Sequence, residues 1–218
     1  MRIIVFGAHA SDAESGAGGT IIKMAGKNNE VIIVPLTHNE KVRSDRSVRE
    51  NIEDTIREAK NASNILNAKL EFLNFVDGEI NVDRHSTEII SSYIKEKKPD
   101  IVFTHWPIDT HPDHQATGIL VLRSILSLKN INPELYFFEV WPGEQTNLFI
   151  PDRYVDISDV AEEKIKALLC YETERVNDPK KGVLEDIKRM MEFRGKEAGV
   201  KYAEAFVSLR KVKISDIF

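Results

Sequence analysis

Short apolar runs alternate with longer stretches of helical periodicity along the 218-residue chain. An uninterrupted run of about four to eight apolar residues is typical of a strand buried on both faces, whereas apolar positions three and four residues apart indicate a helix with one buried side. The apolar runs predict strands at 2–7, 30–36, 69–75, 100–106 and 134–140, and a further short strand at 205–209. The periodic stretches predict helices at 13–27, 48–67, 86–97, 113–128, 159–174 and 181–200.

This alternation predicts the fold class. Strands that are apolar throughout need cover on each face, so we expect an α/β protein with a mostly parallel sheet and helices on both faces. The length suits one core, and the chain contains no repeat, low-complexity tract or evident linker, so we expect residues 1–218 to form a single domain. In such a sheet, ligands bind beyond the carboxyl ends of the strands.

Composition narrows the function classes. The formal net charge is −5, and nothing in the chain demands the basic face that nucleic-acid-binding proteins usually carry. No apolar run approaches the roughly 18–20 residues that cross a bilayer, and the N-terminus lacks the pattern of a signal peptide. We therefore expect a cytoplasmic protein that binds neither nucleic acid nor a membrane.

Two polar segments follow two of the predicted strands directly. "GAHASDAE" follows the first strand, and "THWPIDTHPDH" begins at the end of the fourth. Together they hold four of the six histidines, namely His9, His105, His111 and His114. Because the carboxyl ends of parallel strands meet at one edge of a sheet, the topology allows the two segments to meet.

The glycines near the first segment raise the question of dinucleotide binding. A G-x-G-x-x-G fingerprint should lie in the strand-to-helix turn itself, whereas Gly16, Gly18 and Gly19 come later, after a histidine and two acids. No acidic residue ends the second strand, where a ribose partner is expected. The pattern disfavours a nucleotide.

A metal site accounts for the same residues better. His9 and Asp12 have an H-x-x-D spacing that lets both reach one ion, and His111 and His114 lie close together in the second segment. Imidazole and carboxylate ligands suit Zn²⁺, although another divalent ion also fits, and three protein ligands leave a position for water. The alternative is that these are ordinary loop or capping residues.

The chain resembles the PIG-L/LmbE-like deacetylases. The resemblance rests on "AHASDAESGAGGTI" at 8–21 and "DTHPDHQATG" at 109–118, with "YVDIS" at 154–158 and "GKEAGVKYAEAF" at 195–206, and so extends over nearly the whole chain. It implies a Rossmann-like α/β fold, zinc, and removal of acetyl groups from N-acetylated sugars and their conjugates. It also implies assembly into homo-oligomers and a small-molecule sugar substrate as partner.

The resemblance implies roles for several residues. His9, Asp12 and His114 match the zinc ligands. His111 matches the histidine that polarises the amide or protonates the leaving amine, and Asp113 would orient or tune one of these imidazoles.

Three further positions match substrate contacts of the family. Asp109 matches an acid that touches substrate, and Tyr202 matches a tyrosine that helps hold the oxyanion. Arg57 is the candidate for a substrate-binding arginine, with Arg49 as the alternative, because neither aligns cleanly. Each of these residues also has a simpler explanation. Asp109 is then a solvated loop acid, Tyr202 is a core residue, and either arginine lies on an exposed helical face.

One departure from the family pattern affects the chemistry. The family has Asp as general base at the position of Ser11, and a serine hydroxyl does not accept a proton usefully near pH 7. Glu14 is a candidate replacement, although an acid in a first helical turn also simply favours the helix. We expect a zinc-dependent hydrolase acting on an N-acetylated amino sugar or its conjugate. The alternatives are a metal-retaining, weakly active or inactive sugar-binding homologue, and a hydrolase that uses Glu14 or the substrate as base.

Overall fold

The computed structural model of the chain describes residues 1–42, 44–140, 145–173, 176, 178 and 182–209. The strands in these ranges are β1 (Arg2–Gly7), β2 (Glu30–Pro35), β3 (Lys69–Leu70), β4 (Ile101–His105), β5 (Glu134–Phe138), β6 (Arg153–Asp156) and β7 (Ala203–Ser208). The helices are α1 (Asp12–Ala25), α2 (Val48–Ile65), α3 (Arg84–Lys97), α4 (Pro112–Ser127), α5 (Ala161–Leu168) and α6 (Val183–Ala198).

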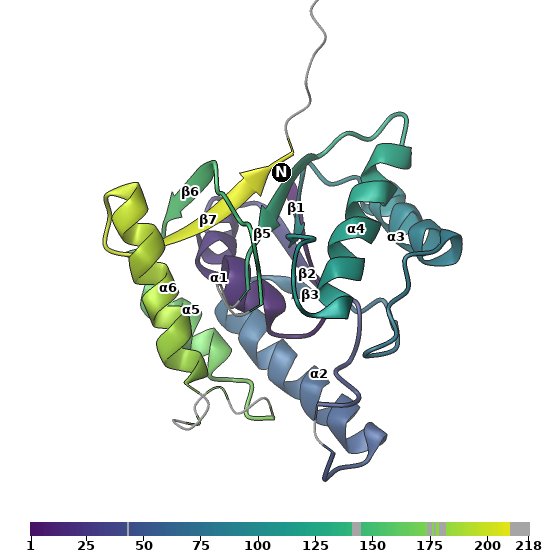
Figure 1. Ribbon diagram of the computed structural model, residues 1–218, viewed down its shortest axis with the longest axis horizontal. Coiled ribbons are helices and arrows are strands. Elements are labelled where there is room, and N and C mark those ends of the chain that lie inside the picture. Colours follow the sequence, from purple (N-terminus) through teal and green to yellow (C-terminus); the bar gives the residue numbers. More distant parts are fainter. Residues whose placement is uncertain (43, 141–144, 174–175, 177, 179–181, 210–218) are drawn as a thin grey trace, which may run out of the picture.

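The strands form one sheet in the order β3-β2-β1-β4-β5-β7-β6 (Figure 1). The first five of these strands are parallel, and β7 pairs antiparallel with both β5 and β6. The predicted α/β class and mostly parallel sheet are confirmed. Within the described ranges, no helix combines the length and apolar content that crossing a membrane requires.

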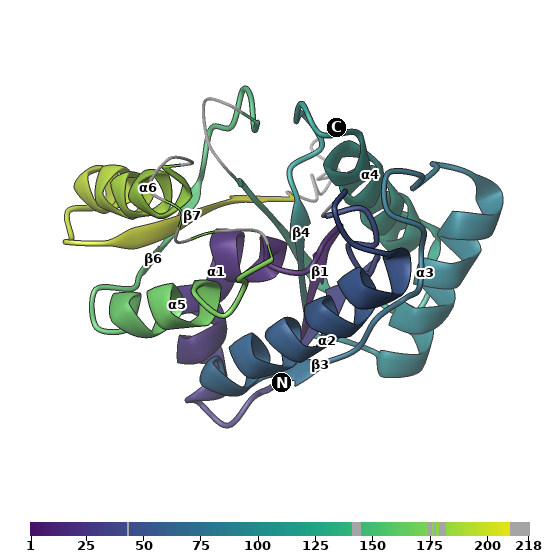
Figure 2. The ribbon, with the colours of Figure 1, turned by 90° about the horizontal axis from the view of Figure 1, so that it is seen from below.

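Helices cover both faces of the sheet because alternate side chains of each strand point to opposite sides. In β1, Ile3 and Val5 pack into a core with residues of α1, α2 and α5. Ile4 and Phe6 point the other way, into a second core with residues of α3 and α4. Figure 2 shows α1 and α5 on one side of β1 and β4, with α3 and α4 on the other.

Two glycines allow α1 to pack close to the rest of the molecule. A Cβ atom on Gly16 would lie 2.3 Å from Cδ2 of Phe138, and one on Gly19 would lie 2.6 Å from Cγ2 of Ile157. Both distances are below any real carbon–carbon contact. These glycines lie inside the helix and serve its packing, so they do not form a phosphate-binding loop.

The structure corrects several predicted boundaries. The strand predicted at 69–75 is reduced to Lys69–Leu70, although the backbone N–H groups of Glu71 and Leu73 still donate to carbonyl oxygens of β2 and Phe75 bridges to Thr37. The helix predicted at 159–174 ends at Leu168, and β6 was not predicted at all. β6 is an edge strand whose residues are mostly exposed, so it has no continuous apolar run to signal a strand.

Candidate metal and catalytic site

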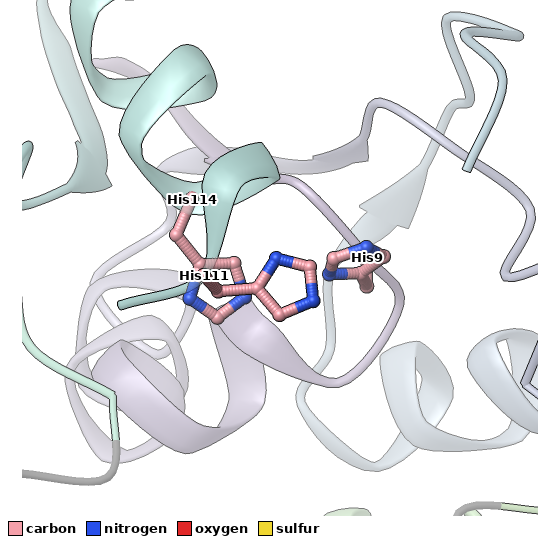
Figure 3. Close-up of side chains that lie close together, drawn as sticks. All are labelled: His9, His111 and His114. Carbon is pink, nitrogen blue, oxygen red and sulfur yellow. The ribbon is translucent and has the colours of Figure 1, made fainter. Parts of the chain in front are cut away.

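The two histidine-bearing segments meet at the carboxyl ends of β1 and β4. These strands are neighbours, but the helix after β1 covers one face of the sheet and the helix after β4 covers the other. Such a reversal opens a crevice between the two strand ends. Figure 3 shows His9, from the loop after β1, beside His111 and His114 at the start of α4. The ring centroid of His111 lies 4.8 Å from that of His9 and 4.5 Å from that of His114.

Local hydrogen bonds fix the loop between β1 and α1. The backbone N–H of His9 donates to Oδ2 of Asp12 over 2.7 Å, and that of Ala10 donates to Oδ1 of Asn39 over 3.0 Å. Ser11 precedes α1 with a φ of 89°, in the left-handed region that serine rarely adopts. Strain of this kind persists where the surroundings enforce it, as they do at many functional sites.

The start of α4 is equally constrained. Pro112 occupies the first helical turn, where its missing N–H costs nothing. His111 is the N-cap residue, and its Nδ1 accepts a hydrogen bond from the N–H of Asp113 over 3.3 Å. A neutral imidazole that accepts through Nδ1 carries its proton on Nε2, so His111 is set up to donate from Nε2.

The three residues predicted as metal ligands lie together. Nδ1 of His9 is 3.6 Å from Oδ2 of Asp12, and Nε2 of His114 is 3.5 Å from Oδ1 of the same carboxylate. Asp12 and His114 are buried, and the His9 side chain is 14% exposed.

The other nitrogen of each of these histidines faces a carboxylate. Nε2 of His9 lies 3.3 Å from both Asp77 Oδ1 and Asp113 Oδ2. Nδ1 of His114 lies 3.3 Å from Asp109 Oδ1. Metal-binding histidines almost always have such a partner, which fixes the ring and its tautomer. His9 Nδ1 and His114 Nε2 both face the Asp12 carboxylate, and imidazole and carboxylate donors of this kind suit zinc.

Electrostatics favour the protonation states that a metal needs at Asp12 and His114, but not at His9. Burial would raise the pKa of Asp12, but the neighbouring His114 and His105 hold it well below its usual range. Burial lowers the pKa of both His114 and His111, and nearby imidazoles lower it further. Burial would also lower the pKa of His9, but hydrogen bonds with Asp113 and Asp12 raise it well above the usual value. Metal binding must therefore displace a proton from His9.

Two residues of the cluster had no role assigned from the sequence. His105 is fully buried at the end of β4, and its Nε2 lies 2.9 Å from Asp12 Oδ2 and 3.1 Å from the N–H of Ala8. Asp77 reaches His9 from the turn after β3. The sequence signal that could have identified His105 and Asp77 is that each lies at or just after the end of a predicted strand. Three groups of side chains have metal-ligand spacing, namely His9, His111 and His114; Asp12, His105 and His114; and His9, Asp77 and Asp113.

Asp109 is buried and its contacts are internal to the protein. Oδ1 accepts a hydrogen bond from the N–H of His111 over 2.8 Å, and Oδ2 accepts one from the hydroxyl of Thr146 over 3.0 Å. Together with the contact to His114, these bonds give the carboxylate a positioning role rather than the predicted contact with substrate.

Glu14 points away from the histidines. Its Oε1 accepts a hydrogen bond from the hydroxyl of Tyr171 over 2.8 Å, and the residue is 1% exposed. Burial raises the pKa of Glu14 to about 7, although the bond from Tyr171 opposes this. The direction of the side chain disfavours Glu14 as the replacement base.

The structure does not bring Arg57 or Tyr202, the other two predicted substrate contacts, to the cluster. Arg57 pairs with Asp54 on the same helix, and its side chain is 58% exposed. Tyr202 lines a hollow of about 350 Å³ between α5 and α6. The N–H of Tyr202 donates to Ser158, and the next residue, Asp159, pairs with Lys23 near the C-terminal end of α1. Asp12 is the first residue of that helix, so these contacts lie at the other end of α1 from the histidines.

The chain is similar to several known proteins in sequence and in fold. Residues 4–125 match the family described as PIG-L, GlcNAc-PI de-N-acetylase. The chain is 27% identical to the diacetylchitobiose deacetylase of Thermococcus kodakarensis over 93% of its own length and 81% of the relative. It is 26% identical to the 4-oxalmesaconate hydratase of Pseudomonas putida, over 77% of its length and 71% of the relative. The N,N'-diacetylchitobiose deacetylase of Pyrococcus horikoshii superposes with a TM-score of 0.86 at 24% identity, covering 100% of this chain and 88% of that one.

Proposed function

Because this chain belongs to the PIG-L family of de-N-acetylases, we propose that it is a zinc-dependent hydrolase that removes the acetyl group from an N-acetylated amino sugar or its conjugate. The observation that carries the proposal is that His9 Nδ1 and His114 Nε2 both face the Asp12 carboxylate, with a second carboxylate beside the other nitrogen of each histidine. The similarity to a diacetylchitobiose deacetylase over 93% of the chain supports the substrate class.

His9, Asp12 and His114 would hold the metal. When bound there, zinc would supply Lewis acidity, which polarises an amide carbonyl and lowers the pKa of a water molecule toward 7. Asp113 and Asp77 keep Nε2 of His9 occupied, so that Nδ1 faces the ion. Asp109 does the same for His114.

His111 supplies a hydrogen-bond donor. Amide hydrolysis develops negative charge on the carbonyl oxygen, and the amine must leave with an added proton. With Nδ1 of His111 turned to the N–H of Asp113, the Nε2–H is the group available to donate a hydrogen bond to that oxygen, and the proton added to the amine comes from the attacking water.

Ser11 leaves the proton-accepting step without a strong base. It occupies the position next to Asp12 where the family pattern has a second Asp, and Glu14 is bonded to Tyr171 instead. The proposed enzyme therefore relies on the metal's effect on water and is slower than relatives that have the base. Arg57 and Tyr202 stay predictions as substrate contacts.

The test is a hydrolysis assay on the purified chain with zinc, and with other divalent ions in parallel. N-acetylglucosamine, diacetylchitobiose and an N-acetylglucosamine conjugate are the substrates, and free amine and acetate are both quantified. We expect equal amounts of amine and acetate, lost on chelation and greatly reduced in His111→Ala.

Two outcomes would overturn the proposal. Stoichiometric metal with no acetate from any substrate would favour the binding homologue. Turnover of 4-oxalmesaconate without turnover of N-acetylated sugars would assign the chain to the chemistry named for its hydratase relative. A homo-oligomer and a cytoplasmic location also stay predictions, and light scattering of the purified chain checks the first.

A further inference from the structure

Two sequence motifs have no part in the proposed reaction. One is the run of glycines in α1, and the other is the tail block at 195–206, whose Tyr202 lies away from the histidines. The structure joins these motifs through a buried ion pair. Glu204 on β7 and Lys164 on α5 both reach the middle of α1, beside its glycines.

The ion pair binds directly to the backbone of α1. Oε1 of Glu204 accepts a hydrogen bond from the N–H of Gly19, and Oε2 accepts one from the N–H of Thr20, both over 2.8 Å. Nζ of Lys164 donates to Glu204 Oε1 over 2.6 Å and to the carbonyl oxygen of Ser15 over 2.7 Å. In a regular helix the N–H of Gly19 donates to the oxygen of Ser15. The Lys164–Glu204 pair therefore binds both partners of that helical hydrogen bond.

The packing leaves room for this pair and excludes water from it. Lys164 is 2% exposed and Glu204 is 4% exposed. A Cβ on Gly18 would lie 3.1 Å from Cγ of Lys164, so glycine at this position lets the lysine stem lie against the helix. Buried charges are costly unless they are paired and hydrogen-bonded, and these two are both.

The pair is linked to the candidate metal site through one turn of helix. Ser15, whose oxygen Lys164 binds, lies three residues after Asp12, and the N–H of Ser15 donates to the oxygen of Ser11 over 2.8 Å. The turn that carries Asp12 is thus held at its far end by Lys164 and Glu204, from elements in the last third of the chain.

We infer that Lys164 and Glu204 are positioning residues, which hold the first turn of α1 so that the Asp12 carboxylate faces His9 and His114. The inference rests on the proposed metal site. It gives the glycine run and the tail block a common purpose, because the glycines admit the pair and the tail supplies its carboxylate. A pair that served stability alone would leave the metal affinity of the folded protein unchanged.

The experiment measures zinc affinity in Glu204→Gln and Lys164→Met by competition with a chromophoric chelator, well below each variant's unfolding temperature. Changes in outer-shell partners typically weaken metal binding by about 10–100-fold, and we expect a loss in this range. Ile94→Ala is the matched control. Ile94 is fully buried in the core on the other face of the sheet, so its truncation lowers the unfolding temperature without touching α1.

Each outcome decides the inference. Weaker zinc binding in both pair variants, with wild-type affinity in Ile94→Ala, supports it. Wild-type affinity in the pair variants, or an equal loss in the control, overturns it. If either variant fails to fold, Glu204→Asp, which keeps the charge on a shorter side chain, is measured in its place against the same criterion. If the wild type itself binds no zinc, the proposed function is refuted, and the inference that rests on it is refuted as well.

Discussion

Helix α1 meets buried polar groups at two places, and they differ in how well their atoms are satisfied. In the middle of the helix, Glu204 and Lys164 bind each other and the backbone over 2.6–2.8 Å, with each donor facing an acceptor. At the first turn, the nitrogens of His9 and His114 lie 3.6 and 3.5 Å from the Asp12 carboxylate. The buried Nδ1 of His105 has no hydrogen-bond partner among the described residues.

The hydrogen bonds of the Lys164–Glu204 pair are complete, whereas the cluster at the first turn includes a buried nitrogen without a partner among the described residues. Buried polar groups in proteins are almost always paired, so a crowded cluster with long contacts calls for an explanation such as a missing ion. A closed network needs nothing further, and its residues act on stability and position. Substitutions at the first turn should therefore change chemistry first, and substitutions along the middle of α1 should change stability first.

The largest effect is expected from removing a metal ligand. His9→Ala, Asp12→Ala and His114→Ala should each remove most of the bound zinc, because two remaining ligands hold the ion poorly. Activity should fall on the order of 10³-fold or more, beyond the roughly 10–100-fold typical of outer-shell partners. Metal per chain, measured by mass spectrometry, is the direct readout.

His38→Ala is the control for the ligand variants. His38 lies outside the cluster, stacked on Phe72 and bonded to Asn74, so its loss should leave the metal content unchanged. A His9→Ala/His114→Ala double variant that still bound one zinc per chain would refute the ligand assignment.

Substitution of His111 should separate catalysis from metal binding. His111→Ala should keep the metal and lower kcat on the order of 10²-fold or more, because it removes a hydrogen-bond donor without removing a ligand. His111→Asn retains an oxygen that can cap α4 and should show the same loss of kcat with better stability. Loss of metal would make His111 a ligand, and an unchanged kcat would make it a bystander.

Close packing at the glycines should appear as a loss of stability. An alanine Cβ at position 16 would collide with the ring of Phe138, and overpacking of this kind costs about 1–3 kcal/mol, partly offset by about 1 kcal/mol of helix propensity. We expect Gly16→Ala to lower the free energy of unfolding in urea by up to about 2 kcal/mol. Gly26→Ala, where the nearest atom to a new Cβ lies at 3.4 Å, is the control. Equal stability of the two variants would show that α1 is not held so closely.

Restoring the family base should raise activity by a smaller amount. Ser11→Asp places a carboxylate beside Asp12, and Asp tolerates the left-handed φ of 89° better than Ser does. We expect kcat/KM to rise about tenfold or more at matched zinc occupancy, because a positioned base typically contributes about 10²–10⁴-fold. A fall, from a wild type that is already fast, would mean that another group accepts the proton.

The smallest effect is expected at Glu14. Because its side chain is bonded to Tyr171, Glu14→Gln should leave kcat within about threefold of the wild type, far from the loss expected on removing a general base. A loss of about 10²-fold at equal metal content would restore Glu14 as the replacement base.

The sequence predicted the parallel part of the sheet because β1, β2, β4 and β5 are apolar throughout. The prediction from the sequence failed for segments that are only partly buried. Arg153, Tyr154 and Asp156 of β6 are exposed, so this edge strand has no apolar signature. The predicted strand at 69–75 is mostly half-buried, and only Lys69 and Leu70 belong to β3, although the N–H groups of Glu71 and Leu73 still donate to carbonyl oxygens of β2.

The candidate site could also be predicted only in part from the sequence. His9, Asp12, His111 and His114 could be grouped because each follows a strand end closely. The direction of a side chain could not be predicted in this way. Glu14 lies two residues after Asp12 yet faces Tyr171, because a step of two positions turns a helical side chain to another face.

The most direct test of the central claim is an anomalous difference map from crystals of the zinc-loaded protein, recorded on both sides of the zinc absorption edge. The account predicts one strong peak within bonding distance of His9 Nδ1, Asp12 and His114 Nε2. A peak held instead by His9, His111 and His114, by Asp12, His105 and His114, or by His9, Asp77 and Asp113 would contradict the assignment of ligands. No peak in fully loaded crystals would contradict the metal site itself.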